Sequence, residues 1–171
     1  MPATPAISDV EELRHSFRPR RVTTLFIGES PPHGGTFFYQ GDSLLHHKMK
    51  ECFGDIPNFL SEFKAKGFFL DDLVSYPINR IKDERERNRH RWNAVSLLAG
   101  RIKEYQPAAV VALMCAIEPM IVEAIRQAGL SHVPLYVTPF PRPEHEKRFK
   151  TKMAEILPKL LTAPSRRDVR Q

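Results

Sequence analysis

The chain has 171 residues, of which 42% are hydrophobic and 27% are charged, and its formal net charge is +6. This length corresponds to one domain that can bury a core without disulfide or metal staples, and the composition excludes a disordered chain. The basic excess fits a polyanionic partner such as nucleic acid, although many proteins without such a partner share it.

Cys52 and Cys115 are the two cysteines of the chain, and neither lies in a CxxC motif. A disulfide framework and a structural zinc site are therefore not expected. The neighbours His46 and His47 would point about 100° apart on a helix and chelate poorly, so we predict no metal. The N-terminus lacks the apolar core of a signal peptide and no apolar run approaches about 18 residues. We predict a cytoplasmic protein without membrane contact.

The first half of the chain predicts short buried strands alternating with capped helices. The expected elements are a helix at 9–17, a strand at 23–27, a helix from 42 or 43 to 53, a helix at 57–66 and a strand at 67–77. Asp9 caps the first helix, and Asp42 or Ser43 caps the second. Pro77 ends the second strand. Residues 1–20 are expected to form a flexible or helical extension.

The second half continues the alternation. The expected elements are a helix at 83–106, a strand at 108–114, a helix at 117–128, a strand at 133–137 and a helix at 144–161. Apolar residues recur at spacings of three and four in the first of these helices: Trp92, Val95, Leu98, Ala99 and Ile102. This pattern predicts an amphipathic helix. The domain then covers 21–162, and 163–171 form a basic tail.

Strands that alternate with helices indicate a parallel sheet covered by helices on both faces. We therefore predict the α/β class, as a three-layer α/β/α domain with a four-stranded parallel sheet. The GxGxxG and GxxxxGK[ST] motifs are both absent, so a dinucleotide-binding or P-loop protein is not expected, and we predict no cofactor.

Ligands of open parallel sheets bind beyond the carboxyl ends of the strands. The residues there are Glu29 and Ser30, Asp71 and Asp72, Met114 and Cys115, and Thr138 and Pro139. Proline stiffens the loops after the first and fourth strands. We expect both loops to border one cavity, with an anionic oxygen facing inward and with the rings of residues 37–39 close enough to cover it.

Three motifs in this order resemble the uracil-DNA glycosylase superfamily over about residues 22–160. GESPPHGG followed by TFF resembles the first motif of its acidic branch, FFLDDLVSYPINR resembles the strand and the Asn-Arg pair that follow, and FPRP lies where relatives carry His-Pro-Ser-Pro. The resemblance implies a uracil-DNA glycosylase-like fold, with a four-stranded parallel sheet between helical layers.

The resemblance implies catalytic roles for Glu29 and Ser30. Relatives often place an Asn or Asp that positions water at the position of Ser30. Glu29 matches the acidic branch and is the better candidate to hold this water, or to stabilise positive charge developing on the sugar. The structural alternative is that Glu29 caps a helix or pairs with an arginine.

Three further residues become candidates for substrate binding. Phe38 matches a ring that stacks on a flipped base, or it is a core phenylalanine. Asp71 lies where relatives read uracil with Asn, or it caps a loop or pairs with Arg80. An ionised Asp only accepts hydrogen bonds, so it would favour a base that presents donors, or would need to be protonated. Asn79 belongs to the Asn-Arg pair.

The chain departs from the superfamily near the fourth strand. Phe140 replaces the catalytic His and cannot donate a hydrogen bond to a leaving base. His145 either substitutes for it or is a surface histidine at a helix start. Arg142 either contacts phosphate or is solvated. The acidic branch holds an iron–sulfur cluster on four cysteines, and two cysteines cannot supply that ligation, so no cluster is expected.

Basic residues gather in the first half of the 83–106 helix: Arg85, Arg87, Arg89, His90 and Arg91. They form either a stripe that contacts phosphates or a solvated helix face, because acidic residues interleave with them.

Two functions remain open. The first is a monofunctional DNA glycosylase, which flips a deaminated or damaged base of DNA and hydrolyses its N-glycosidic bond. The second is a protein of the same fold with a weakened site, which binds a nucleobase, nucleotide or nucleic acid without cleaving it.

Overall fold

A computed structural model describes residues 7–160 of the chain. Within this range there are four strands and seven α-helices. The strands are β1 (Thr24–Gly28), β2 (Phe68–Asp72), β3 (Ala109–Ala112) and β4 (Leu135–Val137). The helices are α1 (Ile7–Ser16), α2 (Leu44–Cys52), α3 (Phe59–Ala65), α4 (Glu84–Asn93), α5 (Val95–Tyr105), α6 (Glu118–Gln127) and α7 (Glu146–Ile156).

The strands form a single parallel sheet in the order β2-β1-β3-β4. In the register, Leu25 of β1 pairs with Phe69 of β2 on one side and with Val110 of β3 on the other. The predicted α/β class and the four-stranded parallel sheet are therefore confirmed. All four strands end at the same edge, which brings the loops after them together.

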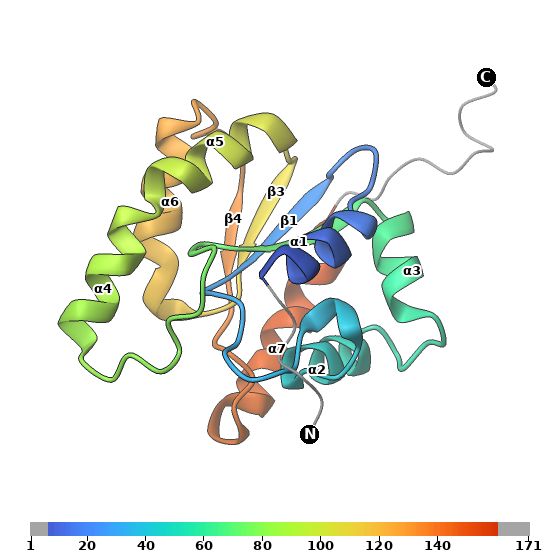
Figure 1. The fold of residues 1–171 in the computed structure, drawn as a ribbon. Coiled ribbons are helices and arrows are strands. Elements are labelled where there is room, and N and C mark those ends of the chain that lie inside the picture. Colours follow the sequence, from blue (N-terminus) through green and yellow to red (C-terminus); the bar gives the residue numbers. More distant parts are fainter. Residues whose placement is uncertain (1–6, 161–171) are drawn as a thin grey trace.

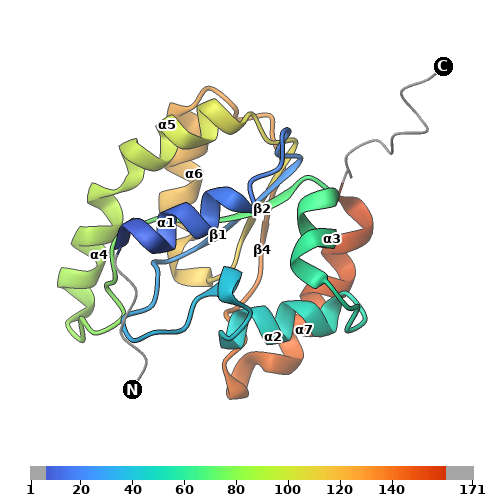
Figure 2. The ribbon, with the colours of Figure 1, turned by 45° about the vertical axis from the view of Figure 1, so that its right-hand side comes forward.

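Helices cover the sheet in two groups, in agreement with a three-layer arrangement. Figure 1 shows α4, α5 and α6 on one side of the sheet and α2, α3 and α7 on the other. The view in Figure 2 shows the same two groups, with α1 lying near β1 and β2.

The core forms where the strands meet the apolar faces of these helices. The central strands are fully enclosed, since Leu25, Phe26 and Ile27 of β1 have no exposed surface. Apolar residues of α5 and α6 cover one face of the core, and those of α3 and α7 cover another, among them Phe63 and Phe149. A strand buried on both faces explains the continuous apolar runs of β1 and β3.

Two predicted elements are wrong in extent. The second strand ends at Asp72 and not at Pro77. Leu73 and Val74 still donate to the carbonyls of Gly28 and Glu29, and the chain then leaves the sheet. The helix predicted at 83–106 is two helices separated at Ala94. The first is almost entirely polar and the second is amphipathic, so each packs in its own way.

The predictions for the helix caps and for the N-terminal helix agree better with the structure. Ser43 is the N-cap of α2 and accepts from the backbone N–H of His46, as predicted for one of two residues. Its neighbour Asp42 instead accepts from the N–H of Phe37 and holds the preceding loop. The extension predicted at 1–20 contains α1. Residues 1–6 and the basic tail predicted at 163–171 lie outside the described residues.

Candidate functional site

A cavity of about 290 Å³ lies at the carboxyl ends of the strands. All four strand ends or the loops after them contribute to its wall: Glu29 and Ser30 after β1, Asp72 at the end of β2, Met114 after β3, and Phe140 and Arg142 after β4. The expectation that the loops after the first and fourth strands border one cavity is confirmed. Two carboxylates and several aromatic rings line this cavity.

Glu29 lies in the cavity wall but is held by two arginines of α4. Nε of Arg87 donates to its carboxylate at 3.0 Å and Nε of Arg91 at 2.7 Å, and a second N–H group of each guanidinium also donates. A carboxylate offers about four acceptor positions. Three of the four arginine N–H groups donate to Oε2 and one donates to Oε1, so the ion-pair alternative is the one observed. The hydrogen bonds that Arg87 donates to Glu29 raise the pKa of its guanidinium.

The basic residues of the 83–106 segment were expected to form either a phosphate-contacting stripe or a solvated helix face. Arg85 and Arg89 are exposed, as the second alternative requires, but Arg87 and Arg91 fit neither alternative. Arg91 is buried and also donates to Glu84 and to Asn88, at 2.8 Å and 2.7 Å. Arg87 turns inward as well and lines the cavity. The buried carboxylate of Glu29 draws both guanidinium groups away from solvent, so they are not available as a solvated row of phosphate contacts.

Ser30 and Asn79 fasten the loop after β1 to the loop after β2. The Ser30 hydroxyl accepts from the N–H of Ile78 at 3.3 Å, and Oδ1 of Asn79 accepts from the N–H of His33 at 3.1 Å. Both residues line the cavity. The hydroxyl proton of Ser30 and the side-chain NH₂ of Asn79 have no protein acceptor within residues 7–160, so both remain able to donate to a ligand.

Phe38 belongs to the core and to the cavity wall at once. It is 4% exposed, and its ring packs against Tyr39, His46 and Phe63 at centroid distances of 5.1, 5.6 and 5.6 Å. It nevertheless borders the cavity, as does the half-buried Phe140. The two rings, which come from distant parts of the chain, give the cavity aromatic surface on which a planar ligand can stack.

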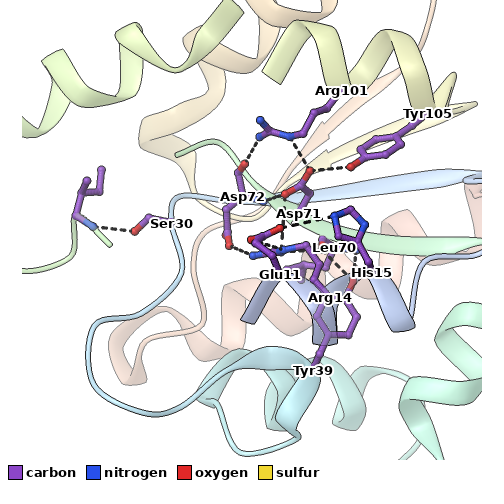
Figure 3. A network of polar contacts seen from close by, with 11 residues as sticks. Glu11, Arg14, His15, Ser30, Tyr39, Leu70, Asp71, Asp72, Arg101 and Tyr105 are labelled. Carbon is purple, nitrogen blue, oxygen red and sulfur yellow. Dashed lines mark hydrogen bonds and ion pairs between the residues drawn. The ribbon is translucent and has the colours of Figure 1, made fainter. Parts of the chain in front are cut away.

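Asp71 does not line the cavity, which corrects its prediction as a base-reading residue. Its Oδ2 accepts from Nε of Arg101 at 2.9 Å and from the hydroxyl of Tyr105 at 3.3 Å, and its Oδ1 accepts from the N–H of Asp72 at 2.7 Å (Figure 3). The partner is therefore Arg101 and not Arg80. Successive strand residues point to opposite faces, and the face of Asp71 is turned away from the cavity.

Asp72 is the carboxylate that the sequence analysis did not select. Its Oδ2 accepts from Arg14 of α1 at 2.8 Å, and the same guanidinium donates to the carbonyl of Leu70 at 3.0 Å (Figure 3). Its Oδ1 lies against Gly28, where a Cβ would come within 2.6 Å of it. Gly28, the register partner of Asp72, thus lets the carboxylate approach the loop after β1. This pairing of a glycine with a buried acid was the signal by which Asp72 could have been selected.

Asp72 has one oxygen free for a ligand. Its Oδ1 accepts no hydrogen bond from the part of the chain that the structure describes. Burial raises the pKa of Asp72, and the charge of Arg14 opposes this effect. The carboxyl group can therefore accept from a ligand N–H when ionised and donate when protonated.

Arg142 and His145 differ in their placement. Arg142 is exposed, lines the cavity, and has no carboxylate at ion-pair distance within residues 7–160. His145 lies in the turn before α7 and does not line the cavity. The interpretation of His145 as a histidine at a helix start is the one observed.

The described residues offer no cluster of three or more His, Cys, Asp or Glu side chains that could hold a metal ion. Within the same range no helix is long and apolar enough to cross a membrane. Cys52 and Cys115 are both free.

Comparison with models of known protein families gave no match, and no curated protein matches the chain.

Proposed function

We propose that this chain is a uracil-DNA glycosylase-like protein that takes a single nucleobase of DNA into the cavity and binds it. The observation that carries the proposal is the cavity itself, which joins two aromatic rings to hydrogen-bonding groups at the ends of a parallel sheet. Its volume of about 290 Å³ is near the lower limit for small-molecule sites, about 300 Å³. This size suits one heterocycle better than a large cofactor, and the proposal requires no cofactor.

The polar groups favour a base that carries both N–H and C=O groups. Oδ1 of Asp72 accepts from a ring N–H, and the side-chain NH₂ of Asn79 donates to a carbonyl oxygen. Phe38 and Phe140 supply stacking surface, which contributes about 1–3 kcal/mol per base. Deamination converts amino groups of bases into carbonyl groups, so uracil, hypoxanthine and xanthine fit this pattern.

Binding without cleavage is the better supported of the two functions. Glu29, the residue expected to hold the attacking water, already accepts from two arginines. Phe140 occupies the position at which relatives carry the histidine that assists the leaving base. A site with these two changes keeps its affinity for a base and loses the groups that the resemblance associates with hydrolysis.

Hydrolysis is the second candidate, and the free oxygen of Asp72 favours it. In this scheme water attacks C1′ of the sugar, the N-glycosidic bond breaks, and the base leaves with the bonding electrons. Asp72 takes the proton of the water, and the cavity-lining cations Arg87 and Arg142 stabilise the negative charge on the base. The raised pKa of Asp72 makes its carboxylate a stronger base than an exposed one.

Binding and cleavage of labelled oligonucleotides test both functions. Single- and double-stranded DNA should carry uracil, hypoxanthine or xanthine at one position, with an abasic site at the same position as the reference. We expect at least fivefold tighter binding, by fluorescence anisotropy, of one base-carrying strand than of the abasic strand. Phe140→Ala should remove this preference, and Leu97→Ala on the exposed face of α5 should keep it. Equal affinity for base-carrying and abasic strands would contradict the proposal.

Alkali-labile breaks in the same samples measure cleavage. Breaks that disappear in Asp72→Asn would establish the hydrolase. Binding with no breaks on any substrate supports the binding protein.

A further inference from the structure

A second hollow, of about 420 Å³, lies beside the cavity against α7 and is called the α7 groove here. Its cationic wall comes from Lys147, Arg148 and Lys152, with Thr151 between them. These residues stand at positions i, i+1, i+4 and i+5, so they share one face of the helix. The opposite face of α7 packs into the core through Phe149, Met153 and Ile156. The groove is therefore a rigidly mounted cationic surface.

The cations of the α7 groove are not neutralised by the protein. Within the described residues no carboxylate lies at ion-pair distance from Lys147 or Arg148, and Lys152 has only Glu155 of its own helix, at 3.6 Å. Lys150, on the same helix but outside the groove, pairs with both Glu51 and Glu146. Glu51 and Glu146 are thus held by Lys150, and no acid lines the groove. Such a surface fits an anionic ligand.

The α7 groove and the cavity adjoin at two places in the chain. At each place, one residue lines the cavity and its neighbour in the sequence lines the groove. Met114 lines the cavity and Cys115 lines the groove, and Phe140 lines the cavity while Pro139 lines the groove. Consecutive Cα atoms are about 3.8 Å apart. The α7 groove therefore adjoins the cavity along both of these loops, after β3 and after β4. Arg142, also without an ion-pair partner in residues 7–160, lies at the same rim.

We propose that the α7 groove holds backbone phosphate groups of the single strand of nucleic acid whose base occupies the cavity. The inference rests on the proposed function and adds the path of the strand across the surface. A cationic groove beside aromatic stacking surface is the arrangement that binds single strands without reading their sequence. The terminal phosphate of a mononucleotide has the same chemistry, so the experiment must separate it from a strand.

Salt dependence of binding tests the groove with a matched pair of variants. Lys147→Gln/Arg148→Gln removes two groove cations. Arg20→Gln/Lys103→Gln removes two exposed cations near the amino ends of the strands, at the opposite edge of the sheet. The measurement is the anisotropy of a labelled single strand that carries uracil, between about 50 and 200 mM salt.

Each lost phosphate contact lowers the slope of log K against log salt concentration by about 0.7. We expect the groove variant to lose about 1.4 from the slope and about tenfold in affinity at low salt. The control variant should lose less than half of this. Equal losses in the two variants would overturn the proposal, because they would show a general effect of charge.

Cys115 reports directly where the strand lies. Cys115 is exposed in the groove, whereas Cys52 is partly buried and burial raises its pKa to about 11. N-ethylmaleimide, which is uncharged, should therefore label Cys115 first at neutral pH. A saturating single strand should slow this labelling at least fivefold, and uridine monophosphate at the same concentration should not. An unchanged rate with the strand, or equal protection by the mononucleotide, would overturn the proposal.

The abasic strand separates the two proposals. If the wild type prefers the base-carrying strand and the groove variant binds like the control, the proposed function stands and the α7 groove fails. If abasic and base-carrying strands bind equally and the groove variant weakens both, the groove stands and the cavity fails. If no strand binds at all, both are overturned.

Discussion

At the scale of single residues, Glu29 acts first as the anchor of α4. Its side chain is 9% exposed, and the side chain of Arg91, one of its two partners, is 1% exposed. The pair therefore shares a site with little access to water. Removing one partner of such a pair leaves an uncompensated charge, which is more costly than losing an exposed pair.

Glu29→Gln should destabilise the fold by about 3 kcal/mol, because it leaves the buried Arg91 without its main counterion. Glu84→Gln is the matched control, since Glu84 also binds Arg91 but is 65% exposed. Glu84→Gln should lower the free energy of unfolding by less than about 1 kcal/mol. Urea unfolding followed by the fluorescence of Trp92, the one tryptophan, measures both. Equal stabilities of Glu29→Gln and the wild type would contradict the structural role of Glu29.

The raised pKa of Asp72 should make the stability of the fold depend on pH. Burial raises its pKa in the folded protein above the value of about 3.9 in the unfolded chain. Proton binding by this group therefore favours the folded state. Its contribution is fully present below about pH 3.9 and is lost as the pH rises through the folded-state pKa.

Asp72→Asn removes this titration and so measures it. The free energy of unfolding of the wild type, minus that of Asp72→Asn, should fall between pH 4 and neutral pH. Urea unfolding at several pH values gives this difference. A difference that grows with pH would show that the pKa of Asp72 is lowered by Arg14 instead.

At the scale of elements, α1 is part of the site. Arg14 is 1% exposed and joins this helix to the carboxylate of Asp72 and to the carbonyl of Leu70. Arg101 and Tyr105 of α5 hold Asp71 on the other side of the strand. The end of β2 is therefore fixed between two helices, and the orientation of Asp72 depends on both.

Arg14→Met should destabilise the protein by about 3 kcal/mol or more, because Asp72 loses its counterion while it remains buried. His15→Ala is the control, since the neighbouring His15 side chain is 54% exposed. Chemical denaturation measures the loss. If Arg14→Met were as stable as His15→Ala, α1 would be a dispensable extension.

The elements themselves were largely predictable from the sequence. Short β-branched and apolar runs gave all four strands, because strands buried on both faces have a continuous apolar pattern. The break at Ala94 was not predictable, since a polar helix and an amphipathic helix join there without proline or glycine. The inward turn of Arg87 and Arg91 depends on Glu29, 58 and 62 residues earlier in the chain. Helix periodicity alone carries no such long-range information.

The site was predicted in part. The order of strands and helices was sufficient to place Glu29 and Ser30 at the carboxyl edge of the sheet. Phe38, Asn79 and Arg142 were selected through the resemblance of the motifs, and all five residues line the cavity. The choice between Asp71 and Asp72 depends on which face each strand residue presents, and a shift of one residue reverses it.

At the scale of the whole molecule, the basic residues include a group that pairs with carboxylates and a group that does not. The arginines Arg14, Arg87, Arg91 and Arg101 are bound to carboxylates and hold the fold together. Arg142 and the cations of the α7 groove have no such carboxylate, apart from Glu155 beside Lys152, among residues 7–160. With a formal net charge of +6, the unpaired cations around the cavity form a surface that suits an anionic ligand.

The most direct test of the central claim, that one base occupies the cavity, is an NMR titration of the ¹⁵N-labelled full chain. The ligands are a trinucleotide with uracil at its centre and the same trinucleotide with an abasic centre, which carries equal charge. If a base occupies the cavity, the amide signals of Gly28, Glu29 and Ser30 should shift only with the uracil-containing ligand. Equal shifts with both trinucleotides, or no shift of these signals at saturation, would contradict it.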